Sequence, residues 1–320
     1  MRLPRWLLLS VMVPVLWGLW GALTEIPEKW LKPTFPPTLG YVVWSLTMIP
    51  VSLIAFRKIN WRLTHTRRSV VYGCAVGFSG AAGQLMLFWV LQQGPAYLIF
   101  PIVCLSPAVT IVLSWTILRE RTYPLALSGI LLSLPAILLV SLQEPSNGPV
   151  RGSLWLVGTI AIFLLWGLQA YFMKSSANAL SAEELFLYMT ATGLALSPVA
   201  LMMGPGLHAG SGTGFALTFA IQSLNAVGCL LFVYAVRYGK AIVVVPMVNG
   251  LFPLVTIIVS LLIYKEIPSR FNLAGMVLAL VAVLLMAFDE VRHSAASQKR
   301  GPRLRQFGGF SCGPHRKRSN

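Results

Sequence analysis

Five amide side chains lie inside long apolar stretches of this sequence. Removing an amide from water is unfavourable unless it finds a hydrogen-bond partner, so we expect these groups to face protein or a polar solute rather than lipid. One interpretation is that they link neighbouring helices to one another. The other is that they offer neutral donors and acceptors to a small polar or zwitterionic solute. The side chains are Gln84, Gln169, Gln222, Asn225 and Asn249.

Aromatic side chains are numerous in the same stretches. Indole and phenol rings could wall a pocket for aromatic or cationic solutes, through stacking or cation–π attraction. Trp and Tyr also gather at membrane interfaces, so that interpretation stays open for each of them. Trp17, Trp166 and Tyr97 are the aromatic residues that we predict to contact a solute.

Two apolar stretches are interrupted by prolines in the same way. They are "IFPIVCLSPAVT" and "VVVPMVNGLFPLVT", the second of which also carries Asn249. A proline removes a helix hydrogen bond, and free backbone groups in lipid are tolerated where protein or a watery cavity surrounds them. We therefore predict that both stretches line a central cavity, although proline is also commoner in membrane helices generally. The prolines are Pro101, Pro107, Pro246 and Pro253.

Ionisable side chains are absent from the middle of the apolar stretches. Intramembrane charges mark proton relays and ion paths, so the sequence argues against a pump built on a buried carboxylate. The charges that remain for gating or coupling stand at the ends of the stretches, at Glu25, Glu120, Lys174 and Glu266. The alternative is that they cap helix ends and pair with neighbouring basic residues.

The composition is that of an integral membrane protein. Of the 320 residues, 56% are hydrophobic and 11% are charged, whereas soluble domains are nearer a quarter charged. A helix needs about 20 apolar residues to cross the bilayer, and the sequence contains ten such segments, or nine if the third and fourth are merged. They cover residues 6–24, 36–56, 70–92, 95–118, 124–142, 153–173, 183–203, 214–236, 241–264 and 270–288.

Basic residues predict the orientation. Most of the 25 Lys and Arg residues fall on the side of the N-terminus if the segments cross in turn, which predicts that both termini are cytoplasmic. The expected location is a bacterial inner (plasma) membrane. The net charge of +16 then reflects attraction to anionic inner-leaflet lipids near the basic loops and tail and not a nucleic-acid partner. Residues 289–320 are predicted to be a disordered basic tail.

The sequence repeats itself at a spacing of 145 to 149 residues. Trp17-Gly18 aligns with Trp166-Gly167, and Gly129 aligns with Gly275. Residues 6–144 and 149–288 form the two predicted repeats, with five segments each. Because five is odd, the second repeat crosses the membrane in the opposite sense, an arrangement used by many secondary transporters.

The repeated residues resemble the drug/metabolite transporter superfamily, in its ten-span EamA-like family. The resemblance rests on the two Trp-Gly pairs and on the blocks "LRERTYPLALSGILLSLPAILLV" and "YKEIPSRFNLAGMVLALVAVLLM". It implies an all-α membrane fold of ten helices, arranged as two inverted five-helix repeats around a central cavity. It also implies transport of small metabolites or toxic compounds, often outward.

These features favour a secondary transporter of small organic metabolites, amino-acid-like, drug-like or similar, that exports its solute by alternating access. A channel or non-transporting scaffold is the first alternative, and a membrane enzyme is the second. The scattered His and Cys residues predict neither a metal nor a cofactor, and the expected state is a monomer or a homodimer. The predicted substrate-binding set is Trp17, Gln84, Tyr97, Pro101, Pro107, Trp166, Gln169, Asn225, Pro246, Asn249 and Pro253.

Overall fold

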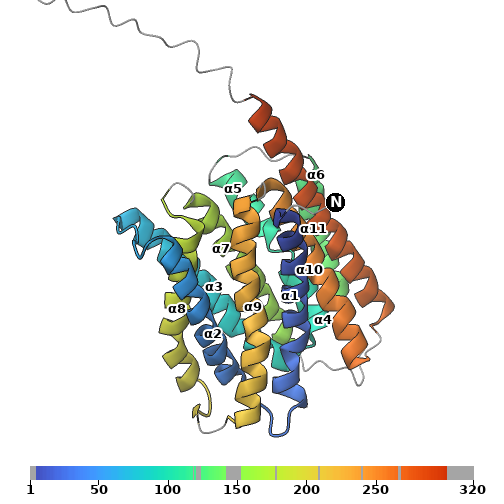
Figure 1. Ribbon diagram of the computed structural model, residues 1–320. Helices are drawn as coiled ribbons and strands as arrows, with labels where there is room; N and C mark the ends of the chain where they lie inside the picture. The colour runs from blue at the N-terminus through green and yellow to red at the C-terminus, as the bar shows by residue number, and fades with distance from the viewer. Residues whose placement is uncertain are drawn as a thin grey trace, which may run out of the picture.

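The protein folds into a bundle of long helices, shown in Figure 1. The computed structural model describes residues 5–117, 119, 124–141, 153–176, 179–207, 210–238, 241–265 and 268–300. Within them the elements are α1 (Arg5–Leu23), the short π-helix η1 (Ile26–Trp30), α2 (Pro37–Lys58), α3 (Arg67–Gln93), α4 (Ala96–Val103), α5 (Pro107–Thr116), α6 (Pro124–Ser141), α7 (Leu154–Ser175), α8 (Ala182–Met202), α9 (Gly212–Tyr238), α10 (Ala241–Tyr264) and α11 (Arg270–Arg300).

A helix occupies each of the ten apolar segments expected from the sequence. Among the described residues, seven helical stretches are long and apolar enough to cross a membrane, and three shorter apolar helices accompany them. The shorter ones are Pro124–Val140, Leu251–Tyr264 and Arg270–Met286. The helices coincide with the predicted segments because the length of an apolar stretch determines both. The count of ten membrane crossings stays a prediction.

The fourth segment is broken, as its prolines predict. Between α4 and α5 the chain makes a turn, and α5 begins at Pro107. The proline ring cannot donate a backbone hydrogen bond inside a helix but suits a first helical position. The carbonyl of Val103, which Pro107 leaves free, accepts instead from the amide of Ser106 at 3.0 Å.

The ninth segment differs from that expectation. Although Pro246 and Pro253 lie within it, α10 is a single helix from Ala241 to Tyr264. One missing hydrogen bond per proline can be tolerated when packed neighbours support the helix, and α10 is packed against both α1 and α11. The predicted interruption is therefore present in only one of the two proline segments.

Helix packing relates the two halves of the chain reciprocally. Helix α1 of the first half packs against α9 and α10 of the second, and α7 of the second half packs against α3, α4 and α5 of the first. Likewise α2 packs against α8, and α6 against α11. In Figure 1, α1 and α9 run side by side in opposite directions.

Glycine contacts show the same exchange at the level of residues. A Cβ atom built on Gly83 of α3 would lie 2.5 Å from Nε1 of Trp166, and one built on Gly228 of α9 would lie 2.5 Å from Nε1 of Trp17. Because the sequence repeat aligns Trp17 with Trp166, the second contact is the first with the halves exchanged.

The two ends of the described chain lie at one end of the bundle. The start of α1 and the end of α11 are both at the top of Figure 1. Helix α11 continues to Arg300, into the segment for which disorder was expected. The helix formers of this segment allow the helix to continue, up to a Gly-Pro pair in the sequence. Residues 301–320 lie outside the described part.

Candidate functional site

A cluster of indole and amide groups joins α1, α2 and α9. Trp20 Nε1 donates to Gln222 Oε1 at 2.7 Å, and Trp44 Nε1 donates to Asn225 Oδ1 at 3.1 Å. Trp17 Nε1 donates to the backbone carbonyl of Asn225 at 3.3 Å. We call these five residues the indole–amide cluster.

Helix periodicity assembles this cluster. Gln222 and Asn225 are three residues apart and so share one face of α9, as Trp17 and Trp20 share one face of α1. Gly228, one turn beyond Asn225, has no side chain and lets the Trp17 ring lie directly on the backbone of α9. The result is a polar patch inside an apolar bundle, contributed by both halves of the chain.

The amide groups of the cluster are almost inaccessible to water. Gln222 has no exposed surface and Asn225 is 9% exposed. The Nε2 atom of Gln222 is buried without a hydrogen-bond partner, and the same is true of Nε2 of Gln84 on α3. Each amide nitrogen is a donor that would suit a carbonyl or carboxylate oxygen.

The predicted residues Trp166 and Gln169 lie at a second, related place. Both project from α7 onto the glycine positions of α3, Trp166 onto Gly83 and Gln169 onto Gly80. Gln84 is the next residue after Gly83. Of the predicted set, the structure therefore joins Trp17 with Asn225 at α9, and places Trp166, Gln169 and Gln84 along α3.

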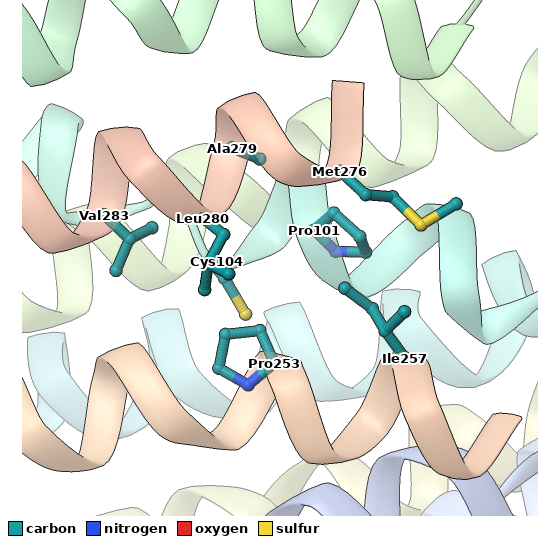
Figure 2. Close-up of a pocket in the computed structure, with 8 residues that line it drawn as sticks. All are labelled: Pro101, Cys104, Pro253, Ile257, Met276, Ala279, Leu280 and Val283. Atoms are coloured by element: carbon teal, nitrogen blue, oxygen red, sulfur yellow. The ribbon is translucent and has the colours of Figure 1, made fainter. Parts of the chain in front are cut away.

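One proline from the fourth segment and one from the ninth line a small apolar cavity. Pro253 of α10 and the lining residues of α11 lie on opposite sides of this cavity, and Pro101 of α4 lies between them (Figure 2). The lining residues are Pro101, Cys104, Pro253, Ile257, Met276, Ala279, Leu280 and Val283. Water could occupy about 10 Å³ of it, which is room for one molecule, whereas organic ligands need sites of roughly 300 Å³ or more.

The remaining predicted residues lie elsewhere or outside the described part. Tyr97 of α4 is buried in the main apolar core, and Pro107 begins α5. The side chains of Pro246, Asn249 and Lys174 lie outside the described residues, as do Glu120 and Glu266.

The carboxylate of Glu25 is bound by two partners at the end of α1. Its carboxylate accepts from the backbone amide of Ala96 at the start of α4 and pairs with Lys29 Nζ at 3.0 Å. Lys29 Nζ also donates to the carbonyl of Gly94 at 2.8 Å. A carboxylate is favourable at a helix N-terminus, so Glu25 fastens η1 to the turn between α3 and α4.

Several residues of interest were not in the predicted set. Trp20, Trp44 and Gln222 complete the indole–amide cluster, and the three-residue spacing within α1 and α9 was the signal that could have grouped them. Glu28 of η1 is 4% exposed, and neither of its carboxylate oxygens has a hydrogen-bond partner. Glu28 lies between the predicted apolar segments 6–24 and 36–56, and the sequence pattern gives no sign of its burial.

The sequence profile of the "EamA-like transporter family" matches residues 4–142 and 153–288. The chain belongs to the EamA-like transporter family. It is thus a multi-pass integral membrane protein of a family of small-solute transporters, as the resemblance to the drug/metabolite transporter superfamily had indicated.

The individual relatives of this EamA-like protein support the fold, and their descriptions name no substrate. A stretch of 75 residues is 37% identical to the "Uncharacterized protein MJ1333.1" of Methanocaldococcus jannaschii, and it covers 23% of this chain and 54% of that protein. The chain thus spans about half the length of this curated relative. A solved structure described as "Crystal structure of protein" superimposes with a TM-score of 0.58 at 15% identity, over 94% of this chain and 99% of that chain. At this identity the likeness shows the fold alone.

Proposed function

We propose that this EamA-like protein is a secondary transporter that exports small organic metabolites, and that the indole–amide cluster binds the solute. The observation that carries the proposal is the buried Gln222 amide, whose oxygen accepts from Trp20 while its nitrogen has no partner. A fully paired structural amide would have both atoms satisfied. The free donor fits a solute that carries a carbonyl or carboxylate oxygen.

The cluster also suits the rest of such a solute. Three indole rings offer apolar faces that can stack on aromatic groups or attract a cation, and the amides of Gln222 and Asn225 are neutral. A small amino-acid-like or drug-like molecule matches this combination of ring faces and neutral hydrogen-bonding groups. The solute-binding residues thus come from α1, α2 and α9.

Alternating access is supported by the reciprocal packing of the two halves. When two related units can exchange their contacts, one site can open first to one side and then to the other. The ten-span, inverted-repeat arrangement remains part of this proposal. In the conformation described, the cavity beside Pro101 and Pro253 has room for about one water molecule and the amides of the indole–amide cluster are buried, so solute entry requires the helices to separate.

The start of α1 and the end of α11 lie at one end of the bundle, which fits the proposed orientation, with the basic loops and tail in the cytoplasm of a bacterium. The protein would act as a monomer or a homodimer, next to anionic inner-leaflet lipids. This placement predicts that reporters fused to either terminus are protected from reagents outside intact cells. Reporters exposed on opposite sides would contradict it.

The function is tested in two stages. First, the metabolites of cells with and without the protein are compared. A compound that accumulates in the cells without the protein is then supplied to proteoliposomes, with and without a pH gradient. Second, uptake is measured for Gln222→Leu and Asn225→Leu, with Ser223→Ala as the matched control, since Ser223 lies on α9 with an exposed hydrogen bond to its own helix. We expect both Leu variants to lose most transport at normal protein levels while the control keeps it. Wild-type transport rates in both Leu variants would contradict the proposed binding site. If the protein transports no solute in a saturable manner, the proposed function is wrong.

A further inference from the structure

We propose that Glu28 is a proton-binding site that controls the opening of the bundle at the η1 end. This end is formed by η1, the start of α4 and the ends of α3 and α10. The role of this site in a transport cycle rests on the proposed function. The proton site itself does not, because it is derived from the surroundings of the Glu28 side chain.

The carboxyl of Glu28 is buried among apolar groups. Its Oε1 lies on the same face of Gly40 of α2 as the ring of Phe88 of α3, within 3.7 Å of the position of a Cβ on that glycine. Both oxygens are buried without a hydrogen-bond partner. A carboxylate in such a place is strongly disfavoured unless it is paired, so the closed arrangement fits a protonated, neutral carboxyl group.

The neighbouring charges do not pair with Glu28. Lys29 and Glu25 are the charged groups that act on it electrostatically, but the Lys29 ammonium is bound to Glu25 and to the carbonyl of Gly94. Among the described residues, the other titratable groups near this end are three tyrosines and three basic side chains, and the end turns of α3 and α9 carry no charged side chain. These groups are Tyr41 of α2, whose hydroxyl donates to Gly193, Tyr97 of α4, Tyr264 of α10, Lys32, Lys265 and Arg270.

Glu28 belongs to η1, and contacts from α10 and α4 hold η1 and the adjoining end of α1 against the bundle. Tyr264 donates to the carbonyl of Ala22 at 2.5 Å, and Trp30 stacks on Tyr264 with ring centroids 5.5 Å apart. The hydrogen bonds that Glu25 and Lys29 make link the same segment to the start of α4. A π-helical turn such as η1 is rare and often marks a functional position.

The chemical step is a simple proton exchange. In the closed state the carboxyl retains its proton, and when η1 moves away, water reaches the group and accepts the proton, leaving a hydrated carboxylate. Protonation from the solution must then precede closure. Acidic solution should therefore favour the closed η1 end, and alkaline solution should favour the open one.

A bound metal cation fits these surroundings less well than a proton. Hard cations require several oxygen ligands, whereas Gly40 and Phe88 offer Glu28 no side-chain oxygen. Varying the sodium concentration at constant pH, and the pH at constant sodium concentration, distinguishes the two ligands.

The test measures access to the η1 end without any solute. Thr24, which is fully buried beside η1, is replaced by Cys in the full-length protein after the natural cysteines are changed to Ala. The labelling rate with a membrane-impermeant maleimide is divided by the rate for Met203→Cys, which is 66% exposed at the same end and corrects for thiol ionisation. We expect the ratio to fall on acidification by up to about tenfold per pH unit, as one bound proton allows.

Variants of Glu28 decide the outcome. Glu28→Gln is neutral and similar in shape, and it should hold the ratio at its low, acidic value at every pH, whereas Glu28→Asp should keep a pH dependence. The infrared carbonyl band of a protonated acid should disappear in Glu28→Gln and persist in Glu184→Gln, a variant at the other end of the bundle. The proposal is overturned if Glu28→Gln keeps the pH dependence, if the band persists in it, or if sodium rather than protons sets the ratio. Because no solute is present, loss of the transport function would leave these results unchanged.

Discussion

The two places where a tryptophan lies on a glycine have the same backbone geometry and different chemistry. On α9, Trp17 covers Gly228, and the two preceding turns carry Asn225 and Gln222. On α3, Trp166 covers Gly83, and the equivalent positions are Gly80 and Gly77. The repeat has thus preserved the close approach of helices, while only the α9 copy carries amides at the two positions that precede the covered glycine at three-residue spacing.

This difference distinguishes the residues that allow close helix packing from the residues that we propose to recognise the solute. The glycine contacts allow α1 to approach α9, and α7 to approach α3, in the same way, which a reciprocal mechanism requires of both halves. The hydrogen bonds from Trp20 and Trp44 to amides of α9 have no equivalent acceptor side chain on Gly77 and Gly80. The comparison is therefore the reason that we propose solute recognition on the α1, α2 and α9 side of the bundle.

Replacement of either covered glycine should have the largest effect. Gly83→Val and Gly228→Val each place a side chain within 2.5 Å of an indole nitrogen, and overpacking of this kind costs about 1–3 kcal/mol or more. We expect the two variants to lower the midpoint of thermal unfolding in detergent by similar amounts. A large loss for one glycine with none for the other would break the equivalence of the two halves.

Amide substitutions should distinguish the two places. Loss of the Asn225 side chain leaves the buried Trp44 N–H unsatisfied, at a cost of about 1–3 kcal/mol, so Asn225→Leu should reduce transport roughly tenfold or more. Gln169→Leu on the α3 side should reduce it much less, although Gln169 belongs to the set predicted from the sequence. Initial rates in proteoliposomes measure both, and equal losses would extend the site to α7.

Removal of a single indole donor should have the smallest effect. Trp44→Phe keeps a ring against Gly193 of α8 and loses only the hydrogen bond to Asn225, worth about 1 kcal/mol. We expect the KM of transport to rise a few-fold with kcat nearly unchanged. A fall in kcat without a change in KM would mean that Trp44 acts on the conformational change and not on solute binding.

Local features of the fold were predictable from the sequence, and long-range pairing was not. Apolar length located the helices, and Pro107 located the break before α5. The same logic failed at Pro253, because packing against α1 and α11 supports a continuous α10. The contacts of α1 with α9 depend on which faces meet in three dimensions, and apolar periodicity carries no such information.

The candidate site was predicted in part for the same reason. Trp17 and Asn225 were identified as polar or aromatic residues in apolar surroundings, and they prove to be hydrogen-bonded to each other. Trp20 was missed because a tryptophan near a helix end is usually interfacial. Glu28 was missed because its burial depends on η1 folding back against α2, which no local pattern signals.

A structure with the transported solute bound tests the central claim most directly. The account predicts an oxygen of the solute within hydrogen-bonding distance of Gln222 Nε2, and a ring or apolar part against Trp17, Trp20 or Trp44. A solute bound instead between Pro101, Pro253 and α11, with the indole–amide cluster unchanged and its Gln222 nitrogen still unpaired, would contradict it.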